Sequence, residues 1–364
     1  MTPPTTTVSL GDPLADAKAD AMADALRDPD RCPQALTDLS AGPPPGWSWE
    51  GSPMAFERAV ALGGEMTNRT LIVDAEYVVK VRRDPRGRDQ DADVRLALVG
   101  SGCRQVVPPV GQGAWGEHVI VTVNPRIHGE DAWRLALAGQ VGLADIDALG
   151  AATGSLHAAM RRVFPMRTTR PAELVETLEA RVRRHADVAP EVAARMPQIT
   201  ALMEAARASA APAPVHHIHG DLHLGQWLRT AAGEWFALDF EGEPGRTPDP
   251  DADSPLEDVA SMLRSLAYTR QHARLLGDAH VPEAAASREA YCLAYEAAAG
   301  GPLDRPLLRA CEAARAAHEV AYETAHRRRF LPIAIAVLDE VLDEGPDEGP
   351  DQAPDTHAAD KVEP

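Results

Sequence analysis

The hydrophobic pattern of the sequence changes once along the chain, near residue 128, and this change limits the folds that it can adopt. Residues 54–127 contain short runs rich in β-branched residues, such as "RTLIVDAEYVVKV" and "EHVIVTVNPRI", separated by Gly, Asp and Pro turns. One helical stretch, "DQDADVRLALVG", interrupts them. The rest of the chain is mostly amphipathic at helical spacing, around residues 132–163, 171–209, 255–276, 283–299 and 305–342. We therefore expect an α+β fold with a small sheet-rich lobe, a larger helical lobe and a cleft between them.

Composition divides the chain into four segments. Asp12 and Pro13 are typical of a helix start, so one helix is expected near the N-terminus. The proline-rich "AGPPPGWSWEGSP" that follows is expected to be a connector. The end of the chain is rich in Pro, Gly and acids, which cannot bury apolar surface. The expected segments are a mobile N-terminus with a short cap (1–55), a sheet-rich lobe (56–128), a helical lobe (129–338) and a disordered acidic tail (339–364).

Charge and hydropathy argue against two classes of partner. The net charge is −19, of which the last 26 residues carry −9, whereas nucleic-acid binding needs a basic surface. The longest apolar run, "FLPIAIAVL", is too short to span a bilayer, and the N-terminus does not resemble a signal peptide. We expect no nucleic-acid or membrane partner and a cytoplasmic location, while monomer and dimer both remain open. The cysteines are far apart and are expected to be reduced thiols: Cys32, Cys103, Cys292 and Cys311.

The stretch "HIHGDLHLGQWLRTAAGEWFALDFEGEP" gathers acids, histidines and a glutamine around a strand-turn-strand pattern. The run "EWFALDF" indicates a buried strand, and the turn "TAAGE" would bring Asp239 back beside Gln226. Magnesium prefers oxygen ligands and takes few carboxylates, so a Gln carbonyl and one Asp suit it. Asp221, which is then not a metal ligand, is free to accept a proton.

Other interpretations of this region and of a glycine motif are weaker. His219 and His223 are four residues apart, but no cysteine or HExxH pattern accompanies them, so a zinc site is disfavoured. His219 is expected to brace the loop or simply to pack. "GQGAWG" matches GxGxxG, but it precedes a strand instead of opening a helix, so a hairpin turn is expected there. The sequence contains no GxxxxGK[ST] or GxSxG motif.

"HGDLHLGQ" followed by "LDFEGEP" resembles the catalytic loop and metal-binding segment of the aminoglycoside-phosphotransferase-like kinases. "LGGEMTNRT" resembles the phosphate-binding turn of this family, and "VVKVRRDPRGRDQDADVRLAL" resembles its lysine strand and acidic helix. "SPLEDVASMLRSLAY" and "AYETAHRRRFLPI" resemble later helices, so the resemblance extends over residues 56–338. It implies a bilobal protein-kinase-like fold with a short N-terminal cap, and it is closest to the actinobacterial glucosamine kinases.

The resemblance also implies ATP and Mg²⁺ as cofactors and a role for each matching residue. Asp221 is implied as the catalytic base, Gln226 and Asp239 as magnesium ligands, and Lys80 as a contact to the nucleotide phosphates. Asp93 stands where the family usually has a glutamate that pairs with this lysine. Further candidates are Glu65, Met66, Thr67 and Asn68 for the phosphates, and His223, Glu241, Tyr322 and Glu323, together with Asp221, for the substrate. Phosphoryl transfer needs a lysine, metal ligands and an acid near the acceptor, and the chain supplies all three.

The expected activity is therefore ATP-dependent phosphorylation of a hydroxyl group on a small sugar. Maltokinases of this family carry a longer N-terminal cap, so the short front of this chain favours glucosamine, with glucosamine 6-phosphate as the product. An acidic protein is compatible with a cationic amino sugar. The alternatives are a maltokinase, an aminoglycoside phosphotransferase and a non-catalytic nucleotide-binding module. A protein kinase is disfavoured because no "APE"-like segment follows "DFEGEP".

Overall fold

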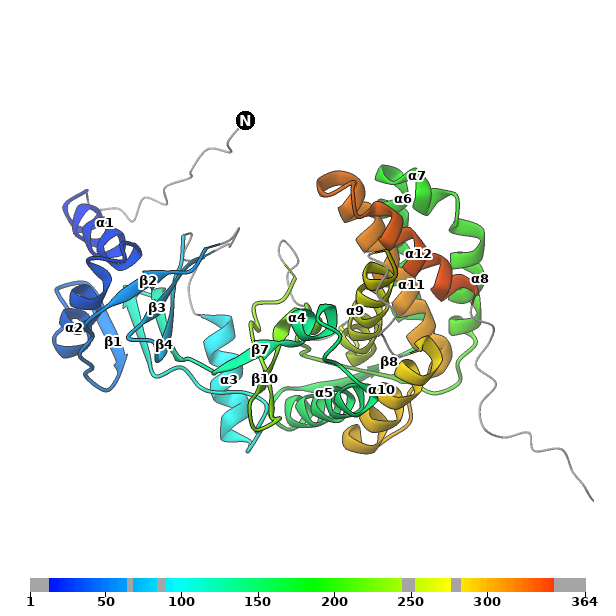
Figure 1. Ribbon diagram of the computed structural model, residues 1–364, viewed down its shortest axis with the longest axis horizontal. Coiled ribbons are helices and arrows are strands. Elements are labelled where there is room, and N and C mark those ends of the chain that lie inside the picture. The colour runs from blue at the N-terminus through cyan, green and yellow to red at the C-terminus, as the bar shows by residue number, and fades with distance from the viewer. Residues whose placement is uncertain (1–12, 64–67, 84–88, 244–252, 276–282, 344–364) are drawn as a thin grey trace, which may run out of the picture. The chain divides into compact units, whose positions relative to one another are not determined.

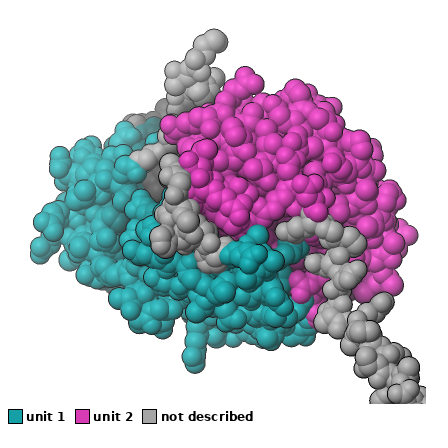
Figure 2. All heavy atoms as spheres, turned by 45° about the vertical axis from the view of Figure 1, so that its right-hand side comes forward, with its two compact units in different colours: residues 1–166, 216–253, 280–301 teal, residues 167–215, 254–279, 302–364 magenta. Residues whose placement is uncertain are grey.

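The computed structural model describes most of the chain and divides it into two compact units (Figures 1 and 2). The described residues are 13–63, 68–83, 89–243, 253–275 and 283–343. Unit 1 consists of residues 1–166, 216–253 and 280–301, and unit 2 of residues 167–215, 254–279 and 302–364. The lobe boundary that the sequence predicts at residue 129 thus lies inside unit 1. The segment with Asp221 and Asp239 also belongs to unit 1, in the same unit as Lys80.

Unit 1 is built on a six-stranded antiparallel sheet in the order β1-β5-β6-β4-β3-β2. Its strands are β1 (Trp47–Gly51), β2 (Ala59–Ala61), β3 (Arg69–Val73), β4 (Tyr77–Val81), β5 (Gly111–Trp115) and β6 (His118–Pro125). One sequence prediction is wrong here, because the expected connector contains the edge strand β1. Another is right only in part: "GQGAW" is strand β5, and the last glycine of the motif, Gly116, lies in the predicted hairpin turn, which joins β5 to β6.

The glycines of β5 make room for large neighbouring side chains. A Cβ atom on Gly111 would lie 2.1 Å from the ring of Trp49, and one on Gly113 would lie 2.5 Å from Leu39. The GxG spacing therefore has a packing cause, because the two glycines lie on the same face of the strand.

The two faces of this sheet have different partners. One face carries buried Leu and Val side chains in a common core with Leu26 of α1 (Pro13–Arg27) and Leu36 of α2 (Cys32–Ala41). Side chains alternate along a strand, so Lys80 and Thr122 point to the other face, where α3 (Gln90–Gly100) lies (Figure 1). The sequence does not predict α2. Residues of the expected N-terminal cap, in α1 and α2, pack into the core of the sheet.

The remainder of unit 1 surrounds a small three-stranded sheet in the order β11-β10-β7. Its elements are β7 (Gly129–Asp131), α4 (Ala132–Leu137), α5 (Leu143–Val163), the 3₁₀-helix η1 (Leu224–Gln226), β10 (Trp227–Thr230), β11 (Trp235–Ala237) and α10 (Ala284–Ala299). α5 and α10 approach closely at two glycines. A Cβ atom on Gly150 would lie 2.3 Å from the carbonyl oxygen of Tyr291, and one on Gly154 would lie 2.6 Å from that of Tyr295.

Unit 2 is helical, as the amphipathic pattern predicts. Its helices are α6 (Pro171–Val188), α7 (Pro190–Ala193), α8 (Met196–Arg207), α9 (Pro255–Leu275), α11 (Arg305–His326) and α12 (Leu331–Asp343). The largely buried helix α11 packs against α6, α8, α9 and α12. Strands β8 (Met166–Thr169) and β9 (Ala213–His216) pair with each other. Helix α12 continues past the predicted start of the acidic tail at residue 339, and residues 344–364 lie outside the described part of the chain.

In the parts of the chain that the structure describes, no helix combines the length and apolar content needed to cross a bilayer.

Candidate active site

The loop before β10 and the segment after β11 run in contact with each other. The predicted hairpin is present, and the Leu238 N–H donates to the Gln226 carbonyl at 2.9 Å. Nε2 of the buried His219 lies 2.7 Å from the Leu238 carbonyl oxygen. A Cβ atom on Gly220 would lie 3.5 Å from the Cα of Gly242. His219 therefore braces the two segments, so that the backbones carrying residues 221 and 239 lie close together.

Asp239 adopts a backbone conformation that side chains normally avoid. Among the described non-glycine residues, positive φ occurs at Asp74 (51°), Ala75 (61°) and Asp239 (64°). Asp74 and Ala75 lie in the tight turn between β3 and β4, which accounts for their conformation. Asp239 lies in no such turn, and a non-glycine residue in this region costs about 1–3 kcal/mol. Strain of this kind is typical of functional sites, and here it accompanies a direct contact with Lys80.

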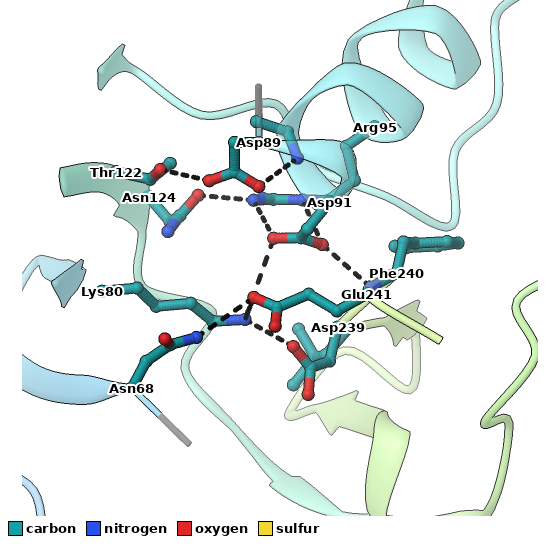
Figure 3. Close-up of polar contacts among 12 residues, drawn as sticks. Asn68, Lys80, Asp89, Asp91, Arg95, Thr122, Asn124, Asp239, Phe240 and Glu241 are labelled. Carbon is teal, nitrogen blue, oxygen red and sulfur yellow. Dashed lines mark hydrogen bonds and ion pairs between the residues drawn. The ribbon is translucent and has the colours of Figure 1, made fainter. Parts of the chain in front are cut away.

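Lys80 is surrounded by three carboxylates, and these four residues form what we call the lysine cluster (Figure 3). Lys80 Nζ lies 2.6 Å from Asp239 Oδ1, 3.8 Å from Asp91 Oδ2 and 3.9 Å from Glu241 Oε1. Burial lowers the pKa of Lys80, but the nearby carboxylates outweigh burial and raise the pKa overall. Lys80 is therefore a fixed positive charge among three acids.

The acid that α3 places beside Lys80 is Asp91, and the prediction of Asp93 is corrected. Residues two apart on a helix point in directions about 200° apart, so Asp91 and Asp93 cannot face the same group. The side chain of Asp91 is only 2% exposed. The sequence does hold one signal for Asp91, because Arg95 follows it at i+4, the spacing of a helical ion pair.

Asp91 connects α3 to the segment that carries Asp239. Arg95 donates to both carboxylate oxygens of Asp91, at 3.1 and 2.7 Å, and the Phe240 N–H donates to Oδ1 at 2.9 Å. Arg95 also donates to Asn124 Oδ1 on β6 at 2.7 Å. Burial raises the pKa of Asp91, but Lys80, Arg95 and the Phe240 N–H outweigh burial and lower the pKa overall. Asp91 thus stays ionised and fixes the backbone next to Asp239.

Glu241 is the third carboxylate of the lysine cluster, and it has two further neighbours. Asn68 Nδ2 donates to its Oε1 at 3.2 Å, and Arg82 Nη2 lies 3.7 Å from the same oxygen. Arg82 is itself held by the buried Asp89, at 2.8 Å. Burial raises the pKa of Glu241, and the charge of Asp239 adds to this effect. Lys80 and Arg82 oppose it, but the pKa is raised overall.

Gln226 and Asp239 fit a magnesium ion by the chemistry of their donor atoms. Asp239 Oδ2 and the Gln226 side chain form no hydrogen bond with any residue in the described ranges, and both side chains are partly exposed. Two oxygen donors of this kind, one charged and one neutral, suit Mg²⁺. The ring of His223 accepts from the Gly225 N–H at 3.0 Å, which stabilises the 3₁₀ turn that ends at Gln226. The remaining phosphate candidates, Glu65, Met66 and Thr67, lie outside the described residues.

Tyr322 and Glu323 belong to unit 2 and have different environments there. Glu323 is fully buried, and its carboxylate accepts from Tyr268 Oη at 3.0 Å and from Arg327 Nη2 at 2.7 Å. Tyr322 is 42% exposed and lies beside His326, with the Arg327 guanidinium over its ring. Of the two candidates, Tyr322 is the one that a ligand can reach without breaking buried hydrogen bonds.

Comparison with known proteins identifies the family. Residues 58–300 match the Phosphotransferase enzyme family, and this range contains Lys80, Asp221 and Asp239. A glucosamine kinase from Mycolicibacterium smegmatis (strain ATCC 700084 / mc(2)155) is 29% identical over 248 residues. That alignment covers 61% of this chain and 61% of the relative, which is less than two thirds of the relative's length.

Two solved structures with similar folds agree with the family match. One is a glucosamine kinase in complex with glucosamine, ADP and inorganic phosphate, with a TM-score of 0.69 and 20% identity over 86% of this chain and 84% of the other. The other is the GDP and kanamycin complex of APH(2")-IIia, with a TM-score of 0.51 and 14% identity over 85% and 97%. At these identities the similarity concerns the fold alone. The predicted fold class is thereby confirmed, and the chain belongs to the Phosphotransferase enzyme family.

Proposed function

We propose that the protein is an ATP-dependent kinase that transfers the γ-phosphate of ATP to a hydroxyl group of a small sugar. The observation that carries this proposal is the contact between Lys80 and Asp239, at 2.6 Å, beside a loop that carries Asp221. Lysine, metal-ligand candidates and an acid are the parts that phosphoryl transfer requires. All of them lie in unit 1.

Each residue has a distinct task in the proposed reaction. Asp221 accepts the proton of the sugar hydroxyl as its oxygen forms a bond to the γ-phosphorus, while the bond from that phosphorus to the ADP oxygen breaks. Lys80 and Asn68 hold the phosphates. Gln226 and Asp239 would hold Mg²⁺, which when bound neutralises charge on the phosphate oxygens. Asp91 positions both sides of this arrangement, because it lies beside Lys80 and accepts the N–H that follows Asp239.

Glucosamine is the proposed substrate, with glucosamine 6-phosphate as the product. Two similar proteins are glucosamine kinases, and one of them was solved with glucosamine and ADP, which supports an amino sugar and an adenine nucleotide. Tyr322 and Glu323 remain candidates for contacts to the sugar, and His223 and Glu241 are candidates in unit 1. Contact through Glu323 would require its bonds to Tyr268 and Arg327 to be exchanged.

The test is a coupled ADP-release assay with ATP and Mg²⁺ over glucosamine, glucose, maltose and aminoglycosides. We expect turnover with glucosamine. Highest activity on maltose or on an aminoglycoside would replace the proposed substrate, and absence of ADP release with all of them would contradict kinase activity.

The role of Asp221 is tested in the same assay. Asp221→Asn should lower kcat about 10²- to 10⁴-fold, the contribution of a general base, while nucleotide binding persists. Glu234→Gln, at the exposed turn between β10 and β11, is the matched control for the loss of one negative charge. Near-normal turnover in Asp221→Asn would refute the assignment.

A further inference from the structure

One oxygen of Glu241 lies within reach of three positive or hydrogen-bond-donating groups from the sheet, two of which, Asn68 and Lys80, are labelled in Figure 3. Asn68 Nδ2 is at 3.2 Å, Arg82 Nη2 at 3.7 Å and Lys80 Nζ at 3.9 Å from Oε1. Asn68 directly precedes β3, Lys80 lies in β4 and Arg82 directly follows β4. Glu241 comes from the segment after β11, 173 residues away from Asn68 in the sequence.

These three donors form a set that suits a phosphate group. Lys80 and Arg82 are two residues apart along an extended chain, so both point to the face of the sheet that α3 covers. An ammonium, a guanidinium and an amide N–H that meet at one oxygen anion are typical of phosphate recognition. In the described chain Asn68 donates to the Glu241 carboxylate. Lys80 and Arg82 lie within ion-pair distance of the same oxygen, while their hydrogen bonds go to Asp239 and Asp89.

The neighbours of Glu241 also argue against a role as a metal ligand. Magnesium needs a shell of oxygen atoms. Oε1 of Glu241 faces two cations, which would repel a third. Asp239, by contrast, has one oxygen on Lys80 and the other without a protein partner among the described residues.

We propose that Glu241 is a built-in competitor for the nucleotide phosphates: its carboxylate lies beside Asn68, Lys80 and Arg82, where a polyphosphate would bind, so the two anions compete for these three groups. This proposal rests on the proposed function, and it adds Arg82 to the phosphate contacts. Two anions cannot share these donors without repulsion, so Glu241 must move away from them. The carboxylate therefore weakens the binding of polyphosphate that carries no metal ion.

The test compares the binding of ADP and of inorganic pyrophosphate by calorimetry, in EDTA and in Mg²⁺. Glu241→Gln keeps the shape of the side chain and removes its charge. In EDTA this variant should bind ADP and pyrophosphate about 3- to 10-fold more tightly than the unmodified protein, the size expected for removal of one partly screened like charge. Arg82→Gln should bind both ligands more weakly by a similar factor.

Controls separate this role from others. Glu234→Gln carries the same charge change at an exposed site and should bind like the unmodified protein. Tryptophan fluorescence during urea unfolding checks that each variant is folded, and Glu241→Ala repeats the comparison if Glu241→Gln is destabilised. Equal affinities of Glu241→Gln and Glu234→Gln in EDTA would overturn the proposal. So would weaker binding by Glu241→Gln in Mg²⁺ alone, because that outcome assigns Glu241 to the metal. If the unmodified protein binds no ADP even with Mg²⁺, the proposed function fails as well.

Discussion

The substitution Asp91→Asn tests the central network of the site. It removes one charge from a buried carboxylate that accepts two hydrogen bonds from Arg95 and one from the Phe240 N–H. Asn keeps an oxygen for one of these donors but presents an NH₂ group to the others. The guanidinium of Arg95 is then buried without its anion, and Lys80 loses one of its three carboxylates.

The expected loss of stability is about 3 kcal/mol. Removing one partner of a buried ion pair costs about 3–5 kcal/mol, and a hydrogen bond to a charged group contributes about 1.5–3 kcal/mol. The lower part of this range applies because the amide oxygen still accepts from Phe240. Asp93→Asn is the matched control, and it should cost less than about 1 kcal/mol because this side chain is only half-buried.

Urea unfolding followed by tryptophan fluorescence measures this loss for unit 1 specifically. All six tryptophans belong to unit 1, at positions 47, 49, 115, 133, 227 and 235. Nucleotide affinity of the same variants gives a second readout, which should fall for Asp91→Asn and stay unchanged for Asp93→Asn. A loss below about 1 kcal/mol for Asp91→Asn, or an equal loss for both variants, would refute the assignment of Asp91.

Three further substitutions test packing and burial. Gly150→Ala should destabilise unit 1 by about 1–3 kcal/mol because its Cβ would meet the Tyr291 carbonyl, whereas Gly301→Ala, with open space around it, should not. Leu36→Ala should cost about 2–5 kcal/mol in the same fluorescence transition, since α2 shares the core of the sheet. A loss near zero would show that α2 does not stabilise the sheet. Burial, with Asp28 nearby, raises the pKa of Cys32 from 9.0 to about 12, so the unfolded chain releases this proton first. The contribution of the protonated thiol to the free energy of unfolding is fully present below pH 9.0 and decreases as the pH rises toward 12. Stability above pH 9.0 should therefore fall less steeply in Cys32→Ala, and equal slopes would contradict the shift.

Long periodic segments are predictable from the sequence because burial of one helical face dominates them. The segments expected at 255–276 and 283–299 agree with α9 and α10 to within a residue. The segment expected at 305–342 is instead two helices, with a break between His326 and Leu331. Pro332 explains this break, because a proline is tolerated in the first turn of a helix but not in its interior.

Strand β1 could not be predicted because its structure depends on a distant partner. "WSWEG" is short, follows three prolines and lies at the edge of the sheet, so its local pattern indicates a connector. Pairing with β5, from Trp47↔Trp115 to Gly51↔Gly111, makes it a strand. The glycines at 111 and 113 likewise suggest a turn or a ligand-binding loop when only the local sequence is considered. Their cause, the space that Trp49 and Leu39 occupy, lies in other parts of the chain.

The candidate site divides in the same way between local and distant information. Asp221, Gln226 and Asp239 lie in short motifs that resemble those of a kinase family, and β10 and β11 bring the last two together as a hairpin must. The partner of Lys80 depends on contacts over 159 residues of sequence, and on the rotational phase of one helix. Asp91 and Asp93 are both acids in the first turn of α3, so residue type alone does not distinguish them.

The direction in which each side chain points from α3 determines whether Asp91 or Asp93 faces Lys80. The position of Arg95, four residues after Asp91, indicates this direction. An Asp and an Arg at i and i+4 normally indicate a solvated ion pair on a helix surface. Here the same spacing marks the buried side of α3, because Asn124 of β6 accepts from the guanidinium and Phe240 donates to the carboxylate. With both oxygens of Asp91 engaged by Arg95, Lys80 stays 3.8 Å away and forms its hydrogen bond with Asp239 instead. The pairing of Asp91 with Arg95 thus determines which acid forms the hydrogen bond with Lys80.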